Sequence, residues 1–407
     1  MARTVERAAP PLLRSGMLVA AASAGGNVAA FALTIVLGRL LAPADFGAVG
    51  ALFALAIIGQ VPGFALQAVL ARQVATRGRT AGGAAPGGLL RAGAAVSAGT
   101  AAVAALLAVP LAGVLHLGSP APTLWLAASL GPATFGFAAQ GLLQGAERFG
   151  ALGLLLLVTA GFRVAGGLAG VPGGPAGVLA GITAGAVATV VFALYLLRGT
   201  PGDGPLPRGL AVEWWHAVLG VGALLALTNA DVVLARHYLP AATSGLYAAG
   251  AVVEKIAFWL PQAVALVVFP RLTDPVARRP ILLRACVAVA GLGAATSIGA
   301  ALLGPWALGL LLGPVYRTLG AELGLFAAAG AAGALVQLLL YSGIAHGSRR
   351  IGALLLVALV ALVGLVATAG HGSVTAVVGS VVLVLGTVAT AGLGMSFRRN
   401  PESRPQL

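Results

Sequence analysis

Charged residues interrupt a long apolar stretch at residues 228–258, TNADVVLARHYLPAATSGLYAAGAVVEKIAF. Only 8% of the chain is charged, yet this stretch carries an amide and four charged side chains: Asn229, Asp231, Arg236, Glu254 and Lys255. A charged side chain at the centre of a bilayer costs about 2.5–3.5 kcal/mol on insertion scales, so such residues usually face a cavity or a partner. The stretch therefore predicts a polar site inside a membrane.

The composition around this stretch is that of an integral membrane protein. The chain has 407 residues, of which 59% are hydrophobic and 60 are glycine, and its mean hydropathy is +1.01. This is too apolar for a soluble domain. The apolar runs reach the roughly 20 residues that a helix needs to cross a bilayer, and they lack the alternation of outer-membrane strands. We therefore expect an all-α polytopic membrane fold.

Charges and clusters of glycine and proline divide the chain into about twelve spans. The spans are 17–37, 46–70, 90–114, 122–143, 151–171, 175–197, 214–235, 245–269, 282–303, 319–344, 351–369 and 373–395. The longest connections, 72–89 and 198–213, are rich in arginine, glycine and proline and are too short to fold alone. No soluble domain is expected between the spans.

The basic residues predict the orientation of these spans. Short cytoplasmic loops hold most of the Lys and Arg residues in membrane proteins. With the N-terminus inside, most of the 24 Lys and Arg residues fall on the cytoplasmic side, which predicts an N-in and C-in topology. The net charge of +14 is then explained by contact with anionic membrane lipids, and a nucleic-acid partner is not expected.

The ionisable residues carry no signature of an enzyme or of a metal site. The five histidines are scattered singly, without the spacing of metal ligands. The single cysteine, Cys286, lies in an apolar run and cannot form an intrachain disulfide. The loops hold few acids and no Asp-x-Asp pair occurs. We expect no catalytic residue, metal or cofactor, and coupling to a proton or sodium gradient stays open.

The two halves of the chain repeat a pattern of arginine, proline and glycine. The first block pairs Arg39 with Arg236, Pro43 with Pro240, Gly47 with Gly245, Pro62 with Pro261 and Arg72 with Arg271. A second block pairs Arg91 with Arg284 and Pro110 with Pro305. The offset between the copies is nearly constant and spans an even number of helices, so both halves should share one orientation about an axis along the membrane normal. We predict two pseudo-symmetric six-helix bundles, residues 1–200 and 201–407.

Three stretches carry a family pattern: LGRLLAPADFGAVGALFAL (37–55), GLLQGAERFGALGLLLL (141–157) and NADVVLARHYLPAATSGLYAAGAVVEKIAFWLPQAVALVVFPRLT (229–273). Together they resemble the Wzx-type oligosaccharide flippases, which are polysaccharide biosynthesis proteins of the multidrug/oligosaccharidyl-lipid/polysaccharide exporter superfamily. The resemblance implies alternating-access movement of a polyprenyl-pyrophosphate-linked oligosaccharide, or a related glycolipid, from the cytoplasmic to the outer leaflet of the cell membrane. It also implies polysaccharide polymerase and glycosyltransferases as partners. A cation-coupled multidrug or toxin extruder of the same superfamily is the alternative.

Five polar residues within the spans are the candidate substrate contacts: Arg163, Asn229, Asp231, Glu254 and Lys255. Arg163 lies deep in its span, and a guanidinium group suits phosphate oxygens, so we expect it to contact a pyrophosphate or a sugar acid. A structural pair with a carboxylate is equally open. Asp231 either takes up a proton or cation, or pairs with Arg236 or Arg163. Glu254 and Lys255 either reach separate partners or neutralise each other.

Three further charged residues, Arg39, Asp45 and Arg236, lie near the outer ends of their spans. We expect them to stabilise the loops there, with an outer gate of changing ion pairs as the functional alternative. Five glutamines either line a path for a sugar or form interhelical hydrogen bonds: Gln67, Gln140, Gln144, Gln262 and Gln337. Small-xxx-small patterns such as GITAG (181–185) are uninformative at this glycine content.

Overall fold

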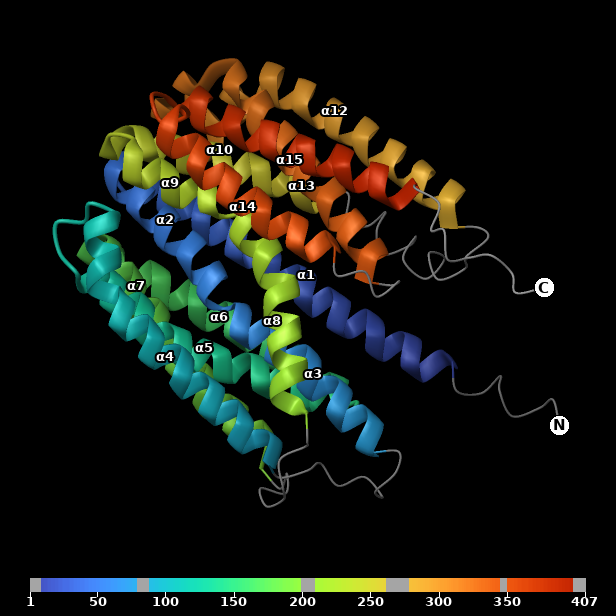
Figure 1. The fold of residues 1–407 in the computed structure, drawn as a ribbon. Coiled ribbons are helices and arrows are strands. Elements are labelled where there is room, and N and C mark those ends of the chain that lie inside the picture. Colours follow the sequence, from blue (N-terminus) through green and yellow to red (C-terminus); the bar gives the residue numbers. More distant parts are fainter. Residues whose placement is uncertain (1–8, 79–87, 199–208, 261–277, 345–349, 398–407) are drawn as a thin grey trace, which may run out of the picture. The chain divides into compact units, whose positions relative to one another are not determined.

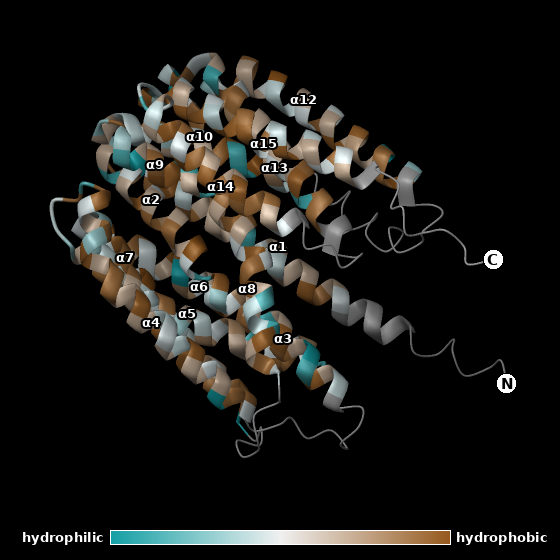
Figure 2. Cartoon of the chain, in the orientation of Figure 1, coloured by the Kyte–Doolittle hydropathy of each residue, from teal (hydrophilic) through white to brown (hydrophobic). Residues whose placement is uncertain are grey.

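The computed structural model describes residues 9–78, 88–198, 209–260, 278–344 and 350–397. Within these ranges every regular element is a helix (Figure 1). Ten of the described helical segments are long and apolar enough to cross a membrane, and hydrophobic residues run along them (Figure 2). Large apolar side chains point outward, among them Leu106 at 78%, Leu302 at 75% and Val360 at 72% exposure. Lipid tails cover such surfaces at no cost, so the chain is an all-α, multi-pass membrane protein.

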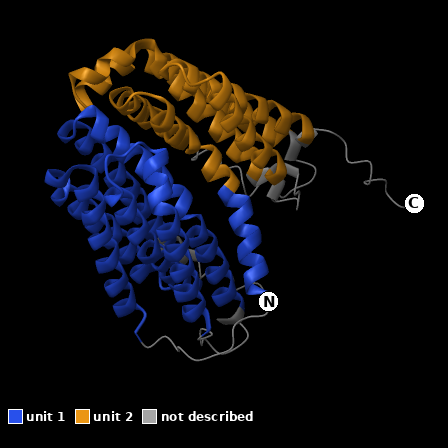
Figure 3. Ribbon diagram, turned by 60° about the vertical axis from the view of Figure 1, so that its left-hand side comes forward, with its two compact units in different colours: residues 1–222 blue, residues 223–407 orange. Residues whose placement is uncertain are grey.

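The first compact unit comprises residues 1–222 (Figure 3). Its helices are α1 (Ala9–Leu40), α2 (Pro43–Gly59), α3 (Val61–Gly78), α4 (Gly88–Val114), α5 (Ala121–Gly145), α6 (Phe149–Ala169), α7 (Gly174–Leu196) and the first part of α8 (Leu210–Leu227), with a short 3-10 turn η1 (Val171–Gly173). Buried leucines from α3 to α6 pack together in its core: Leu66, Leu70, Leu89, Leu143 and Leu155. This core holds the helices that surround the first polar site.

The second compact unit comprises residues 223–407. Its elements are the end of α8, α9 (Ala230–Tyr238), α10 (Ala241–Trp259), α12 (Arg278–Leu311), η3 (Pro314–Glu322), α13 (Leu323–Ile344), α14 (Arg350–Thr368) and α15 (Val374–Phe397). Its core contains Leu282, Val289, Leu338 and Cys286, which is a small packed side chain. The units divide within α8, whereas the repeat predicts a division before α8, after residue 200; that boundary stays a prediction.

Two of the predicted spans are broken helices. The span 46–70 consists of α2 and α3, which meet at Gln60. Pro62 follows this break and lacks the N–H group that would continue the helical hydrogen bonds. The span 214–235 consists of α8 and α9, which meet at Asn229, where φ of −133° and ψ of −9° leave the helical region. Both breaks occur beside a polar site.

With each broken pair counted as one span, the described helices correspond one for one to the predicted spans, which confirms the fold class with its twelve transmembrane helices. The eighth span is described only as far as residue 260. Three residues of the predicted repeat and sugar path lie outside the described residues: Pro261, Gln262 and Arg271. The orientation of the chain relative to the membrane stays a prediction.

The two copies of the predicted repeat share a local elbow between helices. The elbow from α1 to α2 passes through Ala42 and Pro43, and the elbow from α9 to α10 passes through Leu239 and Pro240. The residue before each proline is extended, with ψ of 152° at Ala42 and 153° at Leu239, as the proline ring requires. An arginine lies in the last turn of the preceding helix in both copies: Arg39 in α1 and Arg236 in α9.

The packing of α4 on α5 has the same pattern as the packing of α12 on α13. Ser97 and Ala101 of α4 lie against Gly131 of α5, as Ser297 and Ala301 of α12 lie against Gly324 of α13. Gly93 of α4 meets Ala138 of α5, as Gly293 of α12 meets Ala331 of α13. A Cβ atom on Gly131 would lie 3.0 Å from the Cβ of Ala101, and one on Gly324 would lie 3.0 Å from the Cβ of Ala301. Each unit therefore holds a helix pair whose close approach depends on small residues.

Candidate functional site

The first polar site is a cavity of about 550 Å³ inside the first unit. Its walls come from α1, the α2–α3 break, α5, α6 and α7. Amides, hydroxyls and one guanidinium group gather on these walls: Ser23, Asn27, Gln60, Gln67, Ser129, Gln140, Gln144, Thr159, Arg163 and Thr189. No Asp or Glu is among the described residues that line the cavity. The cavity therefore carries positive charge without a compensating acid.

Arg163 of α6 supplies this charge. Its guanidinium carbon Cζ lies 5.3 Å from the centroid of the Phe53 ring, which is a cation–π contact. Its Nε is buried and has no hydrogen-bond partner among the described residues, and no carboxylate of those residues forms an ion pair with it. A buried donor without a partner costs about 1–3 kcal/mol. This favours a ligand that brings an acceptor oxygen, and within the described chain the expected structural alternative, an ion pair, is not formed.

The glutamines of the cavity hold helices together and also face the cavity. Gln140 and Gln144 are one turn apart on α5 and so share a face. Gln67 Nε2 of α3 donates to Gln144 Oε1 at 3.4 Å, an interhelical hydrogen bond of the kind predicted. The two helices approach closely there, because a Cβ atom on Gly141 would lie 2.5 Å from the carbonyl oxygen of Gln67. Gln337 lies elsewhere, buried in α13 of the second unit.

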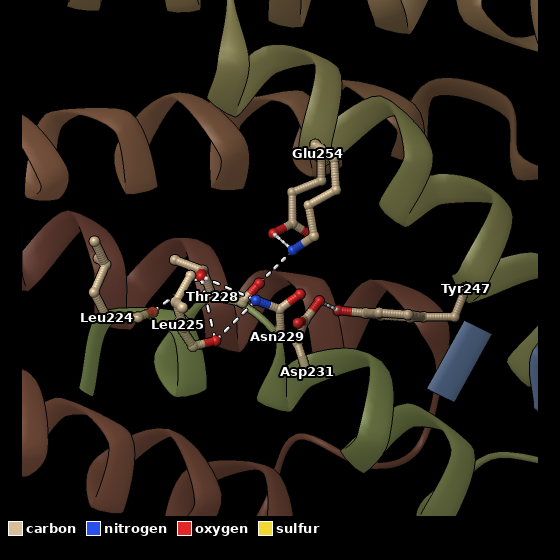
Figure 4. A network of polar contacts seen from close by, with 8 residues as sticks. Leu224, Leu225, Thr228, Asn229, Asp231, Tyr247 and Glu254 are labelled. Atoms are coloured by element: carbon tan, nitrogen blue, oxygen red, sulfur yellow. Dashed lines mark hydrogen bonds and ion pairs between the residues drawn. The ribbon is translucent and has the colours of Figure 1, made fainter. Parts of the chain in front are cut away.

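The second polar site lies at the α8–α9 break (Figure 4). The last carbonyl groups of a helix have no helical donors, and here side chains take that place. Asn229 Nδ2 donates to the carbonyl of Leu225 at 2.8 Å, and the carbonyl of Leu224 accepts from Thr228 Oγ1 at 2.9 Å in addition to the backbone N–H of Thr228. Lys255 Nζ of α10 donates to the carbonyl of Thr228. A lysine from α10 thus caps the C-terminal end of α8, where the helix dipole favours a positive charge.

Two buried acids lie beside this lysine. Asp231 is 0% and Glu254 is 2% exposed. Tyr247 Oη donates to Asp231 Oδ2 at 2.9 Å, and Lys255 Nζ lies 3.4 Å from Glu254 Oε1. One oxygen of each acid, Asp231 Oδ1 and Glu254 Oε2, has no hydrogen-bond partner among the described residues. Neutralisation of Glu254 by Lys255 is therefore only part of the arrangement, since the ammonium group also binds the backbone of Thr228.

The candidate substrate contacts fall into these two sites, one in each unit. Arg163 belongs to the cavity of the first unit. The other four come together at the α8–α9 break: Asn229, Asp231, Glu254 and Lys255. Asn229 faces the carbonyls of α8 while Asp231 faces Tyr247, in line with the expectation that residues two apart point in different directions.

The three residues considered for a gate lie at the helix elbows. Arg236 is 7% exposed, and its Nη1 donates to Ser244 Oγ at 3.1 Å across the α9–α10 elbow. Arg39 lies in the last turn of α1 and Asp45 in the first turn of α2, and these are the ends where the helix dipole favours their charges. These positions suit the stabilisation of loops, and a gate stays a proposal.

Sequence reasoning missed Tyr247, the donor that holds Asp231. A signal was present, because Tyr247 and Glu254 are two turns apart on one helix and so share a face. Phe53 and Gln60, which border the cavity of the first unit, were missed although they too are two turns apart along one span.

Comparison with known proteins identifies the fold. No protein-family model and no curated protein matches the sequence. An inward-facing multidrug resistance MATE family transporter of the MOP superfamily matches with a TM-score of 0.76 and 14% identity over 91% of this chain and 93% of that chain. The lipid II flippase MurJ, in an inward closed conformation, matches with a TM-score of 0.74 and 9% identity over 95% of this chain and 88% of that chain.

A MOP superfamily transporter from Pyrococcus furiosus Vc1, described as having a binding pocket of reverse polarity, matches with a TM-score of 0.54 and 16% identity over 94% of each chain. The chain therefore has the fold of MOP superfamily transporters. The matched structures are transporters and a flippase.

Proposed function

We propose that this chain is a flippase for a polyprenyl-pyrophosphate-linked oligosaccharide or a related glycolipid. It moves this lipid from the cytoplasmic to the outer leaflet of the cell membrane by alternating access, as a step of cell-surface polysaccharide biosynthesis. The observation that supports the proposal most is the cavity of the first unit, which has Arg163 in its wall and no acid among its described lining residues.

The chemistry of this cavity matches the head group of such a lipid. Pyrophosphate oxygens accept hydrogen bonds from the planar guanidinium group, and Arg163 Nε has no partner among the described residues. The amides of the same walls offer donors and acceptors to sugar hydroxyls. A volume of about 550 Å³ lies within the roughly 300–1,000 Å³ of small-molecule sites. It suits a head group, while the isoprenoid chain stays in lipid.

The second candidate is a cation-coupled multidrug or toxin extruder of the same superfamily. The TM-score of 0.76 to a multidrug transporter and the two buried acids of the second unit favour it. A lipophilic cation entering the cavity of the first unit would instead meet Arg163 without an acid beside it. Because this positive charge disfavours a cationic substrate, we rank the extruder below the flippase.

The experiment is reconstitution of the full chain in vesicles that contain a fluorescent polyprenyl-pyrophosphate glycan. We expect Arg163→Ala to slow its movement between leaflets at least tenfold, because a hydrogen bond to a charged group contributes about 1.5–3 kcal/mol. Arg163→Lys keeps the charge and should retain part of the rate. The matched control is Arg198→Ala: the Cζ of Arg198 lies 5.0 Å from the Tyr195 ring centroid, but Arg198 does not line the cavity.

The vesicle experiment also separates the two candidate functions. Wild-type protein that leaves the glycolipid in its leaflet but extrudes a lipophilic cation would replace the flippase with the extruder. Equal glycolipid movement by wild type and a folded Arg163→Ala variant would remove Arg163 from the mechanism.

The proposed function also predicts the binding partners of the chain. Its partners are anionic membrane lipids together with the polysaccharide polymerase and glycosyltransferases that make and extend the lipid-linked glycan. Co-purification of such enzymes with the tagged chain from native membranes tests this proposal, and their absence from gently solubilised preparations would contradict a stable complex.

A further inference from the structure

The buried charges at the α8–α9 break do not balance if every group is ionised. Asp231 and Glu254 bring two negative charges, and Lys255 brings one positive charge beside Glu254. Burial makes an uncompensated charge costly, and buried acids respond by holding a proton. The cluster formed by Asp231, Glu254, Lys255 and Tyr247, termed the acid pair site below, therefore needs one further positive charge.

The hydrogen bonds at the acid pair site show where that charge belongs. Tyr247 and Lys255 each satisfy one oxygen, Asp231 Oδ2 and Glu254 Oε1. The other oxygen of each acid is buried and has no donor among the described residues. The two side chains point toward each other from α9 and α10 (Figure 4). An ionised carboxylate only accepts hydrogen bonds, so two ionised acids leave both oxygens unsatisfied.

We propose that the acid pair site binds a single proton, shared between Asp231 Oδ1 and Glu254 Oε2. One acid then donates and the other accepts, so a single proton satisfies both oxygens and brings the net charge of the site to zero. Because the two acids lie on opposite sides of the α9–α10 elbow, a movement at this elbow that separates them would release the proton. The site thereby couples proton release to a change in helix arrangement.

A proton fits this site better than a metal cation. Lys255 Nζ lies 3.4 Å from Glu254 Oε1, so a metal ion bound between the acids would sit near an ammonium group. Hard metal cations also need several oxygen ligands, and two of the four carboxyl oxygens are already engaged by Tyr247 and Lys255. The described residues hold no group of three or more His, Cys, Asp or Glu side chains that would bind a metal ion.

The helices around the acid pair site add few titratable groups. On α9, Arg236 donates to Ser244, and Tyr238 packs against His371 with ring centroids 5.2 Å apart. From α13, Phe326 packs edge-on against Tyr247, with ring centroids 4.9 Å apart. Helix α15, which also packs against α9, has no ionisable residue along its length. The proton balance of the site is therefore set mainly by its own two acids and lysine.

The proton site goes beyond the proposed function and does not depend on it, since protons can drive a flippase or an extruder. The test is infrared difference spectroscopy of the full chain in lipid nanodiscs at neutral pH, where exposed carboxyl groups are ionised. We expect the C=O band of one protonated carboxyl group per chain in the wild type. Asp231→Asn and Glu254→Gln should each abolish the whole band. The double variant should show the same loss of band intensity as either single variant.

The matched control is Glu322→Gln, because Glu322 accepts a hydrogen bond from Thr375 and lies outside the acid pair site. This variant should keep the band. Tyr247→Phe keeps both acids and should shift the band without removing it, which tests the site even if an acid variant fails to fold. The absence of a protonated-carboxyl band in the wild type would overturn the proposal. It would also be overturned if each single variant lost only part of the band intensity and the two partial losses added up in the double variant.

A sodium titration separates the proton from a metal cation. We expect the band and the unfolding temperature to be the same in sodium chloride and in a chloride salt of a bulky organic cation. Loss of the band with a saturable rise in unfolding temperature on adding sodium would assign the site to sodium and overturn the proton. Glycolipid movement by a protein without this band would overturn the proton site alone and leave the proposed function standing.

Discussion

Arg72, near the end of α3, forms an ion pair with Glu213 in the first turn of α8, with 2.5 Å between its Nη2 and the carboxylate Oε2. Gln73 donates to the same oxygen at 3.0 Å. One residue further along α8, Trp214 Nε1 donates to the carbonyl of Pro62 at 3.0 Å. Pro62 lies in the first turn of α3, beside the α2–α3 break at Gln60. The start of α8 is thus bound to α3 at two points, the Glu213–Arg72 ion pair and the Trp214–Pro62 hydrogen bond. Helix α8 then continues along the chain to its own break at the second polar site.

The two attachments should differ in strength and in salt dependence. Trp214→Phe keeps the aromatic ring and removes the donor, so we expect a loss of about 1 kcal/mol in the free energy of unfolding. Glu213→Gln should cost about 0.2–1 kcal/mol, because its ion pair is exposed, with side chains 62% and 33% exposed. Only the second loss should shrink at high salt.

Unfolding of both variants in one detergent, at low and high salt, measures these losses. Trp215→Phe is the control, since Trp215 is 54% exposed and should tolerate the change. A loss for Trp215→Phe as large as that for Trp214→Phe would show that the hydrogen bond to Pro62 contributes nothing.

The cavity of the first unit should bind pyrophosphate through Arg163. We expect inorganic pyrophosphate to raise the unfolding temperature of the wild type, because a ligand that binds only the folded state stabilises it by mass action. Arg163→Ala should weaken this binding at least tenfold, equivalent to about 1.4 kcal/mol, and Arg163→Lys should lie between. Arg198→Ala should behave as the wild type. An equal rise in unfolding temperature for wild type and Arg163→Ala would show that pyrophosphate binds to another part of the chain.

The fold class was predictable because composition and length determine it. The predicted span 90–114 corresponds to α4 (Gly88–Val114), since a long apolar run in lipid has few alternatives to a helix. The break inside the span 214–235 was not predictable in the same way. It is held by Lys255 of another helix and by the side chains of Thr228 and Asn229, and apolar periodicity does not record such contacts.

The site was predicted as residue types and not as pairs. Polar residues in apolar spans can be recognised from the sequence because placing them in a bilayer costs free energy. Their partners cannot be recognised in this way, because they depend on which helix faces lie together. The register of helix packing shows the same limit. Aligning Arg91 with Arg284 sets Gly93 against Cys286, whereas the packing of α4 and α12 sets Gly93 against Gly293. The chain has 60 glycines, so many alignments of its two halves match glycines. Sequence identity alone therefore does not determine which residues of α4 and α12 correspond.

Helices α6 and α7 pack through glycines, among them Gly181 and Gly185 of the small-xxx-small pattern GITAG. A Cβ atom on Gly166 would overlap the carbonyl of Gly181, and one on Gly181 would overlap the carbonyl of Gly166. We expect Gly166→Ala to lower the free energy of unfolding by about 1–3 kcal/mol through overpacking. Gly161→Ala on the same helix is the matched control, because nothing lies within 4 Å of its added Cβ. Helix propensity alone favours alanine over glycine, so Gly161→Ala should be neutral or stabilising, and an equal loss for both variants would show that the contact with Gly181 is not the cause.

The lysine of the acid pair site should be energetically coupled to its acid. Lys255→Met leaves Glu254 Oε1 and the carbonyl of Thr228 without their donor, so we expect a loss of about 3 kcal/mol in the free energy of unfolding. Glu254→Gln removes the charge that the lysine balances, and the double variant should therefore cost at least ~1 kcal/mol less than the sum of the single losses. The same cycle on the exposed pair of Arg72 and Glu213 should give a coupling below about 1 kcal/mol. Strict additivity for Lys255 and Glu254 would show that the lysine serves only the broken end of α8 and does not balance the charge of Glu254.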